Sequence, residues 1–268
     1  MTIELEIIRV IIAYVFVLGL FFALRMRGIG RERLLIIAMI RMTVQLILIG
    51  YLLIYIFDHP HPLWTLFVIL LMILFAIHTV LKKFPGQLSP KLKRVIATSL
   101  PLCGLPILIF FLLVVIGIEP YFDPQYVIPI AGMIIGNSMT GISLGLNTMI
   151  KGMRVEREAI EAHLLLGATP RQATKDLIDH AFDNAITPTI NSMLGMGIIF
   201  LPGMMTGQIL AGVVPTMAIQ YQIVIMLGIL SSVSATTFIA LKFGMLTFFR
   251  NDMLLDDGKQ DRIANDGP

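Results

Sequence analysis

The chain has 268 residues, of which 57% are hydrophobic and only 14% are charged. Soluble domains carry about 25% charged residues, so this composition excludes an ordinary soluble protein and indicates an all-α protein that crosses a lipid bilayer several times. The net charge of +3 does not indicate nucleic-acid binding, because the basic residues lie in short loops and form no continuous patch with interleaved aromatic residues.

Apolar runs recur along the chain, and a run of about 18 or more residues can cross the roughly 30 Å hydrocarbon core as a helix. The sequence predicts seven spans, at residues 8–24, 34–56, 63–81, 95–118, 127–150, 189–200 and 221–246. The sixth run is short, and a start near Ala185 would lengthen it. We therefore predict one transmembrane domain over residues 1–250 and a flexible polar tail over residues 251–268.

Lysine and arginine gather in every second loop, in segments 25–33, 82–94, 151–175 and 250–262. The intervening loops 57–62, 119–126 and 201–220 contain neither residue. Cytoplasmic loops of membrane proteins carry an excess of lysine and arginine. The pattern therefore predicts an N-terminus outside the cell and a cytoplasmic C-terminus.

Residues 201–220 form an apolar stretch that prolines and glycines interrupt, LPGMMTGQILAGVVPTMAIQ. Irregular backbone persists at membrane depth only where protein or a water-filled cavity surrounds it. Two interpretations remain open: a re-entrant segment, and an outer loop that lies on the membrane surface.

A long polar interval, residues 155–188, separates the fifth and sixth spans and lies on the predicted cytoplasmic side. Its first part predicts an amphipathic helix, because Ile160 and Leu164 lie four residues apart and Leu165 and Leu166 widen the apolar stripe. Gly167 suits the position after the end of this helix, where the backbone adopts a positive φ.

A second helix is predicted to begin directly after Gly167. Thr169 is the expected N-cap, Pro170 suits the first helical position, and Gln172 can close a capping box. Pro188 is expected to mark the return to the membrane. Such a cytoplasmic hairpin can dock into a cleft of another protein, or it can lie flat on the bilayer as an amphipathic connector.

Glu161, Ala162 and Gly167 resemble the EAA-x-x-x-G loop of ABC importer permeases, with His163 in place of the second alanine. Four longer segments, at 128–147, 161–173 and 184–212 and in the span that follows, resemble the FetB-type permeases. These are ABC membrane subunits associated with iron export in bacteria, and their plant relatives contribute to aluminium tolerance.

The resemblance implies a partner ABC ATPase on a separate chain, and this chain contains no G-x-x-x-x-G-K-[ST] loop of its own. It implies a transport subunit of the bacterial cytoplasmic membrane that is not itself an enzyme, carries no cofactor, and leaves ATP and Mg to the partner. The residues expected to couple to that ATPase are Glu161, Ala162, Gly167, Thr169, Pro170 and Arg171. Seven spans are few for an ABC core, so we expect a homodimer of the permease.

Polar residues inside the predicted spans are candidates for the translocation path. Arg41 and Gln45 lie one turn apart in the second span, where Arg41 could instead extend its charge to the membrane surface. The fifth and sixth spans add the candidates Asn137, Thr140, Asn147 and Asn191. The alternative is that these side chains only join helices by hydrogen bonds.

Small residues in the fifth span form two G-x-x-x-G intervals, which let helices approach closely. The predicted packing positions are Gly132, Gly136, Gly141 and Gly145. The sequence does not identify a metal site; the candidate ligands are the thioethers of Met133, Met193 and Met196, and mobile packing is the alternative.

The sequence therefore favours the permease of an ATP-driven exporter of iron or another metal ion. A secondary transporter or channel without an ATPase is an alternative, which the absence of paired intramembrane Asp or Glu residues disfavours. The second alternative is an ABC permease for an organic or nucleotide-sugar cargo. The spans contain no Ser/His, Glu/His or paired-Asp arrangement that would indicate an intramembrane enzyme.

Overall fold

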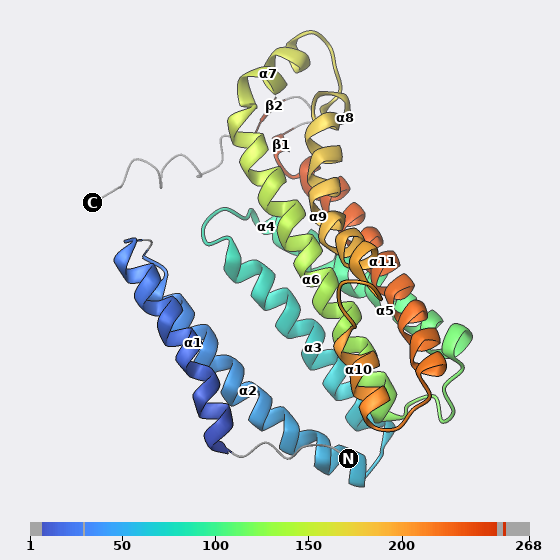
Figure 1. Ribbon diagram of the computed structural model, residues 1–268. Coiled ribbons are helices and arrows are strands. Elements are labelled where there is room, and N and C mark those ends of the chain that lie inside the picture. The colour runs from blue at the N-terminus through green and yellow to red at the C-terminus, as the bar shows by residue number, and fades with distance from the viewer. Residues whose placement is uncertain (1–6, 29, 251–253, 256–268) are drawn as a thin grey trace. The chain divides into compact units, whose positions relative to one another are not determined.

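The computed structural model describes residues 7–28, 30–250 and 254–255 (Figure 1). The chain divides into two compact units: Met1–His61 with Leu210–Gly212, and Pro62–Ile209 with Val213–Pro268. We call them unit 1 and unit 2 and describe each by itself. A single domain over residues 1–250 remains a prediction.

Unit 1 contains two long apolar helices, α1 (Ile7–Met26) and α2 (Glu32–Asp58). Gly28 and Gly30 both have positive φ, at 62° and 68°, in the connection between them. A hydrogen bond between the hydroxyl groups of Tyr14 and Thr43 joins the two helices. Both helices match the predicted first and second spans.

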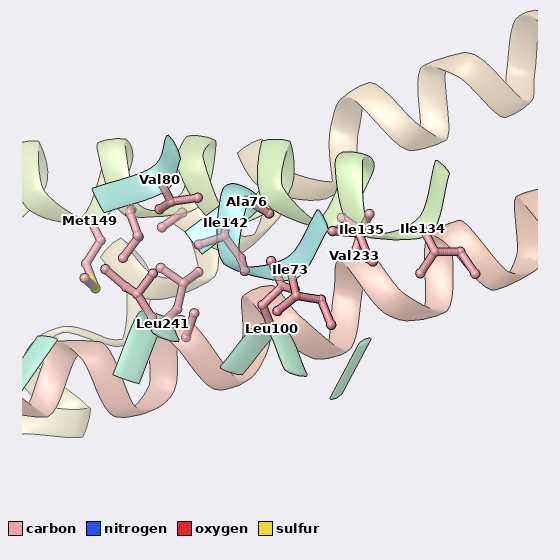
Figure 2. Close-up of a cluster of buried hydrophobic side chains, with 14 of the residues drawn as sticks. Ile73, Ala76, Val80, Leu100, Ile134, Ile135, Ile142, Met149, Val233 and Leu241 are labelled. Atoms are coloured by element: carbon pink, nitrogen blue, oxygen red, sulfur yellow. The ribbon is translucent and has the colours of Figure 1, made fainter. Parts of the chain in front are cut away.

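Unit 2 is built around α6 (Pro124–Val155), which packs against α3 (Pro62–Lys83), α9 (Lys175–Gly195) and α11 (Pro215–Leu246) (Figure 1). Its core is aliphatic and closely interdigitated. Figure 2 shows side chains from α3, α6 and α11 meeting at its centre, together with Leu100: Ile73, Ala76, Val80, Ile134, Ile135, Ile142, Met149, Val233 and Leu241.

The predicted fourth span is a continuous but irregular helix. It consists of α4 (Pro90–Ser99), the π-helix η1 (Leu100–Gly104), α5 (Leu105–Phe110) and the π-helix η2 (Phe111–Ile116). Pro101 and Pro106 lack the N–H that a regular helix needs, and wide π-turns are one way in which a helix passes such positions. Gly117, with a φ of 67°, ends the element.

Five helical segments in the described part of the chain are long and apolar enough to cross a membrane. They are Glu32–Asp58, Pro62–Lys83, Pro90–Ile116, Pro124–Val155 and Pro215–Leu246. A shorter apolar stretch, Ile12–Met26, lies in α1. The structure is therefore that of an all-α polytopic membrane protein, while the predicted number of seven spans stays a prediction.

The predicted end of the sixth span and the predicted start of the seventh are wrong, while the seventh ends at Leu246 as predicted. The helix predicted for residues 189–200 is the end of α9, which stops at Gly195, and Met196 is extended. A short helix, α10 (Gly203–Leu210), then lies within the interrupted stretch 201–220, and α11 begins at Pro215 rather than at residue 221. Proline suits the first turn of a helix, which is why α11 starts there.

The chain after α11 forms a two-stranded pairing, β1 (Phe249–Arg250) with β2 (Leu254–Leu255). Of the predicted tail at 251–268, residues 251–253 and 256–268 lie outside the described residues.

Candidate coupling hairpin and polar helix face

The polar hairpin begins with a bend at the end of α6. Glu156 has φ −95° and ψ 14°, and α7 (Arg157–Leu165) follows it. Ile160 is 2% exposed and packs with the core of unit 2, so it anchors this short helix. Arg157 Nε donates to Glu161 Oε1 at 2.9 Å on the half-exposed side of α7.

The turn of the hairpin has the capped geometry that the sequence predicts. Gly167 has a φ of 91°, and its N–H donates to the carbonyl of Leu164 at 3.0 Å. Thr169 is the N-cap of α8 (Pro170–Ala173): its N–H donates to Gln172 Oε1 at 2.9 Å, and Gln172 N donates to Thr169 Oγ1 at 3.4 Å. The predicted capping box is confirmed, and it fixes the chain on both sides of the turn.

Two leucines at this turn differ from the prediction. Leu165 and Leu166 were expected to widen the apolar stripe of the first helix, yet they are 90% and 85% exposed. The reason is that Ile160 and the half-buried Leu164 already fill the contact of α7 with the core. The hairpin therefore presents two adjacent leucines to solvent next to a rigid turn.

The other predicted coupling residues surround this pair along the chain. Ala162 and Arg171 are exposed, and Pro170 occupies the first position of α8 as expected. Glu161 is half-buried and paired with Arg157. The structure thus gathers the six predicted coupling residues on one short segment with a defined backbone.

The point at which the hairpin returns to the membrane, predicted at Pro188, stays a prediction. α9 runs from Lys175 to Gly195 without interruption and contains Pro188 in its interior. Thr187 and Ser192 donate hydroxyl hydrogen bonds to carbonyls one turn earlier, on either side of the proline. Most of the second arm of the hairpin and the following apolar segment are therefore one helix, and α8 with Thr174 joins this helix to the turn.

The glycines of α6 mark where this helix meets its neighbours. A Cβ at Gly141 would lie 2.7 Å from Val233 Cγ1, and a Cβ at Gly145 would lie 3.3 Å from the carbonyl oxygen of Ala181. Gly132 has only an ordinary contact, 3.7 Å from Met72 Cε, and Gly136 has open space. Of the two G-x-x-x-G intervals, the second is the one at the contact with α9 and α11.

Sequence analysis missed the tightest of these contacts. A Cβ at Gly152 would lie 2.0 Å from Leu177 Cδ1, in the first half of α9. Gly141, Gly145 and Gly152 are spaced by four and seven residues and so follow one face of α6. This spacing was the available signal for Gly152, although the residue lies outside the predicted span 127–150.

The polar candidates on α6 lie on a face that unit 2 leaves uncovered. Asn137 and Thr140 are exposed near the middle of this 32-residue helix, and Asn147 is half-buried further along. Asn137 Nδ2 donates to the carbonyl of Met133 at 2.7 Å, and Thr140 Oγ1 donates to the carbonyl of Gly136 at 3.1 Å. These local bonds use only part of the hydrogen-bonding capacity of the amide and the hydroxyl.

A polar face of α9 lies beside the uncovered polar face of α6. Asn184 Nδ2 donates to Thr148 Oγ1 at 3.2 Å, which joins the polar edges of α6 and α9. Asn191 is exposed two turns further along α9, on the same side as Asn184. Pro188 has no N–H, so the carbonyl of Asn184 lacks its usual helical donor. We call Asn137, Thr140, Asn147, Asn184 and Asn191 the polar face.

The remaining path candidates belong to unit 1. Arg41 and Gln45 are exposed on one side of α2 and line the same shallow hollow.

The methionine candidates for a metal site pack as apolar side chains. Met133, Met193 and Met196 are partly buried against the core of unit 2. Within the described ranges, no three His, Cys, Asp or Glu side chains gather in a way that could hold a metal ion.

The family described as "Uncharacterised protein family (UPF0014)" matches residues 7–249, which include both the hairpin and the polar face. The chain belongs to this family. UPF0014 membrane protein YjkA of Bacillus subtilis is 38% identical over 222 residues, covering 83% of this chain and 87% of that protein.

Other relatives carry more specific names. The Escherichia coli protein named "Probable iron export permease protein FetB" is 38% identical over 200 residues, covering 75% of each chain. The Arabidopsis thaliana protein named "Protein ALUMINUM SENSITIVE 3" is 36% identical over 200 residues, covering 75% of this chain and 71% of that protein. These findings confirm the predicted resemblance. No solved structure matches the chain with significance.

Proposed function

We propose that this protein is the membrane-spanning permease subunit of an ATP-driven exporter, that a separate ABC ATPase docks on the hairpin at residues 155–188, and that the cargo is iron or another metal ion. The observation that carries the proposal is the pair Leu165 and Leu166, 90% and 85% exposed beside a capped turn. Adjacent exposed leucines on an otherwise polar hairpin form an apolar patch with a polar rim, which is a mark of an interaction surface.

The geometry of the hairpin suits the transmission of force. Gly167 and the capping box of Thr169 and Gln172 fix the turn, so the leucine pair is held without further ordering on binding. α8 follows the turn, and α9 then runs through Pro188 to Gly195. The contacts of α9 with Gly141 and Gly145 join it to α6. Movement of a docked ATPase would therefore be transmitted to the helices that carry the polar face.

The polar face supports the homodimer. Amide and hydroxyl groups at bilayer depth are costly unless they meet polar partners or water. Asn137 and Thr140 lie near the middle of α6 and are exposed in the single chain. A second copy that places its own polar face opposite would cover these groups and enclose a hydrated path between the two subunits.

The nature of the path is compatible with a cargo that must be released. Its side chains are neutral, and oxygen atoms of amides and hydroxyls are weak ligands compared with thiolates or paired carboxylates. The relative from Escherichia coli carries the name "Probable iron export permease protein FetB". The proposed cargo class follows from that relative together with the weak ligand set.

The proposal is tested with inverted membrane vesicles that contain the permease and the ATPase that co-purifies with it. An exporter should move labelled iron into such vesicles when ATP is added. Vesicles with the permease alone, and vesicles whose ATPase has its Walker A lysine replaced, should show no ATP-dependent uptake. Equal uptake with and without ATP would contradict the proposal and favour a secondary transporter or channel.

A further inference from the structure

A groove in unit 2 lies next to the turn of the hairpin and shares Arg171 with the predicted coupling residues. It runs between the first half of α9 and the last turns of α11, which lie side by side in Figure 1, and has a volume of about 280 Å³. Its apolar lining comes from both helices: Ile178 and Phe182 from α9, and Phe238, Leu241 and Met245 from α11.

The groove has a defined direction, because the two helices run antiparallel. At one end, Thr174 Oγ1 lies 3.6 Å from Met245 Sδ. At the other end, the rings of Phe182 and Phe238 meet edge to face, with centroids 6.1 Å apart. Phe182 lies eight positions after Thr174, so the groove follows α9 for about 12 Å.

Charged and apolar side chains are segregated along this length. Arg171 in α8 and Lys175 at the start of α9 lie at the end of the groove that is next to the turn. On α11, Lys242 lies nearer to this end of the groove than Phe238 does. The apolar end is marked by the ring of Phe238, which is 53% exposed. The positive-inside pattern places the basic end at the cytoplasmic surface and the aromatic end toward the hydrocarbon.

The basic end carries an excess of positive charge. Three cationic side chains line the groove together with one carboxylate, that of Asp179. Lys175 Nζ donates to Asp179 Oδ2 at 2.7 Å, and this hydrogen bond and the nearby negative charge raise the pKa of Lys175. Neither Arg171 nor Lys242 has a carboxylate partner among the residues that the structure describes; Lys242 Nζ lies 5.4 Å from the ring centroid of Phe238.

We propose that this groove binds an anionic phospholipid of the cytoplasmic leaflet, with its phosphate at Arg171 and Lys242 and an acyl chain along Ile178 and the two phenylalanine rings. Basic pockets between transmembrane helices on the cytoplasmic side bind anionic headgroups. A soluble phosphate compound would use the cations and leave the apolar lining empty. A phospholipid has a phosphate for the basic end of the groove and an acyl chain for its apolar end. In a bilayer the phosphate lies at the surface and the acyl chain in the hydrocarbon, which is the same order.

The test uses the purified full-length protein in detergent, titrated with dioleoyl phosphatidylglycerol or with dioleoyl phosphatidylcholine, which has the same acyl chains. Bound lipid is counted by native mass spectrometry. We expect phosphatidylglycerol to bind more tightly. The Arg171→Gln/Lys242→Gln double variant should lose about 30-fold in affinity for it, about fivefold for each side chain.

The matched control is the Lys91→Gln/Lys93→Gln double variant, which removes two exposed cations from α4 on the same predicted side of the membrane. It should bind phosphatidylglycerol as the wild type does, and glycerol 3-phosphate should not displace the lipid. Three results would each overturn the proposal. They are equal binding of the two lipids, equal affinity of the two double variants for phosphatidylglycerol, and displacement of the lipid by glycerol 3-phosphate. Loss of ATPase binding in the Arg171→Gln/Lys242→Gln variant with lipid binding unchanged would assign the groove to the ATPase instead.

Discussion

Replacing the two exposed leucines of the hairpin tests the docking surface most sharply. In the Leu165→Ser/Leu166→Ser variant the fold should be unaffected, because 90% and 85% of these residues already face solvent. Burial of a leucine side chain contributes about 1.5–3 kcal/mol, so an interface that covers both would lose about 3–4 kcal/mol at the lower part of this range. The dissociation constant for the ATPase should therefore rise by about a hundred- to a thousand-fold.

The measurement is a binding titration of the ATPase that co-purifies with the wild type against permease held in nanodiscs. The matched control is Ile198→Ser/Ile199→Ser, which replaces two residues that are 91% and 81% exposed in the segment between α9 and α10. The control should bind the ATPase as the wild type does. A leucine variant with wild-type affinity would refute the reasoning, since the hairpin would then not be the contact.

Three further outcomes are expected. Gly141→Leu should destabilise the protein by about 1–3 kcal/mol, because even a Cβ there lies 2.7 Å from a neighbouring carbon. The measurement is the thermal unfolding temperature in detergent, which should fall for Gly141→Leu but not for Gly136→Leu, where there is open space. Equal shifts in the two variants would contradict the packing account. Thr169→Ala should lower stability by about 1 kcal/mol through loss of the N-cap, and an unchanged unfolding temperature would argue against a fixed turn. Asn137→Leu/Asn191→Leu should abolish transport in vesicles while ATPase binding persists, whereas normal transport would remove these residues from the path.

Local rules were sufficient for the turn of the hairpin. Gly167, Thr169, Pro170 and Gln172 each fit a position whose backbone requirement depends on close neighbours in sequence. The structure has the same caps at the same residues. The long apolar helices were likewise predictable, because their length and hydropathy do not depend on what they pack against.

The missed features depend on tertiary packing. Periodicity placed Leu165 and Leu166 on an apolar stripe, but α7 is so short that Ile160 and Leu164 alone complete its contact with the core. Proline usually ends a helix, yet α9 passes through Pro188. In both cases the sequence of a single helix does not show which other helices it packs against.

The fourth span and the contact of α6 illustrate the same limit. The prolines at 101 and 106 predict irregular backbone but not its form, and the structure has π-turns on both sides of α5. Gly152 was missed because its role depends on Leu177, which the sequence places 25 positions away. Neither the pairing of helices nor their register follows from composition.

The central claim is that a separate ATPase contacts the hairpin at its exposed turn, and site-directed crosslinking tests it most directly. Cys103 is the one cysteine of the chain, so a Cys103→Ser background permits a single new thiol at Leu165→Cys or, as the matched control, at Ile198→Cys. A photoactivatable thiol reagent at position 165 should crosslink to the ATPase in native membranes, and the reagent at position 198 should not. A crosslink from position 198 with none from position 165 would contradict the account.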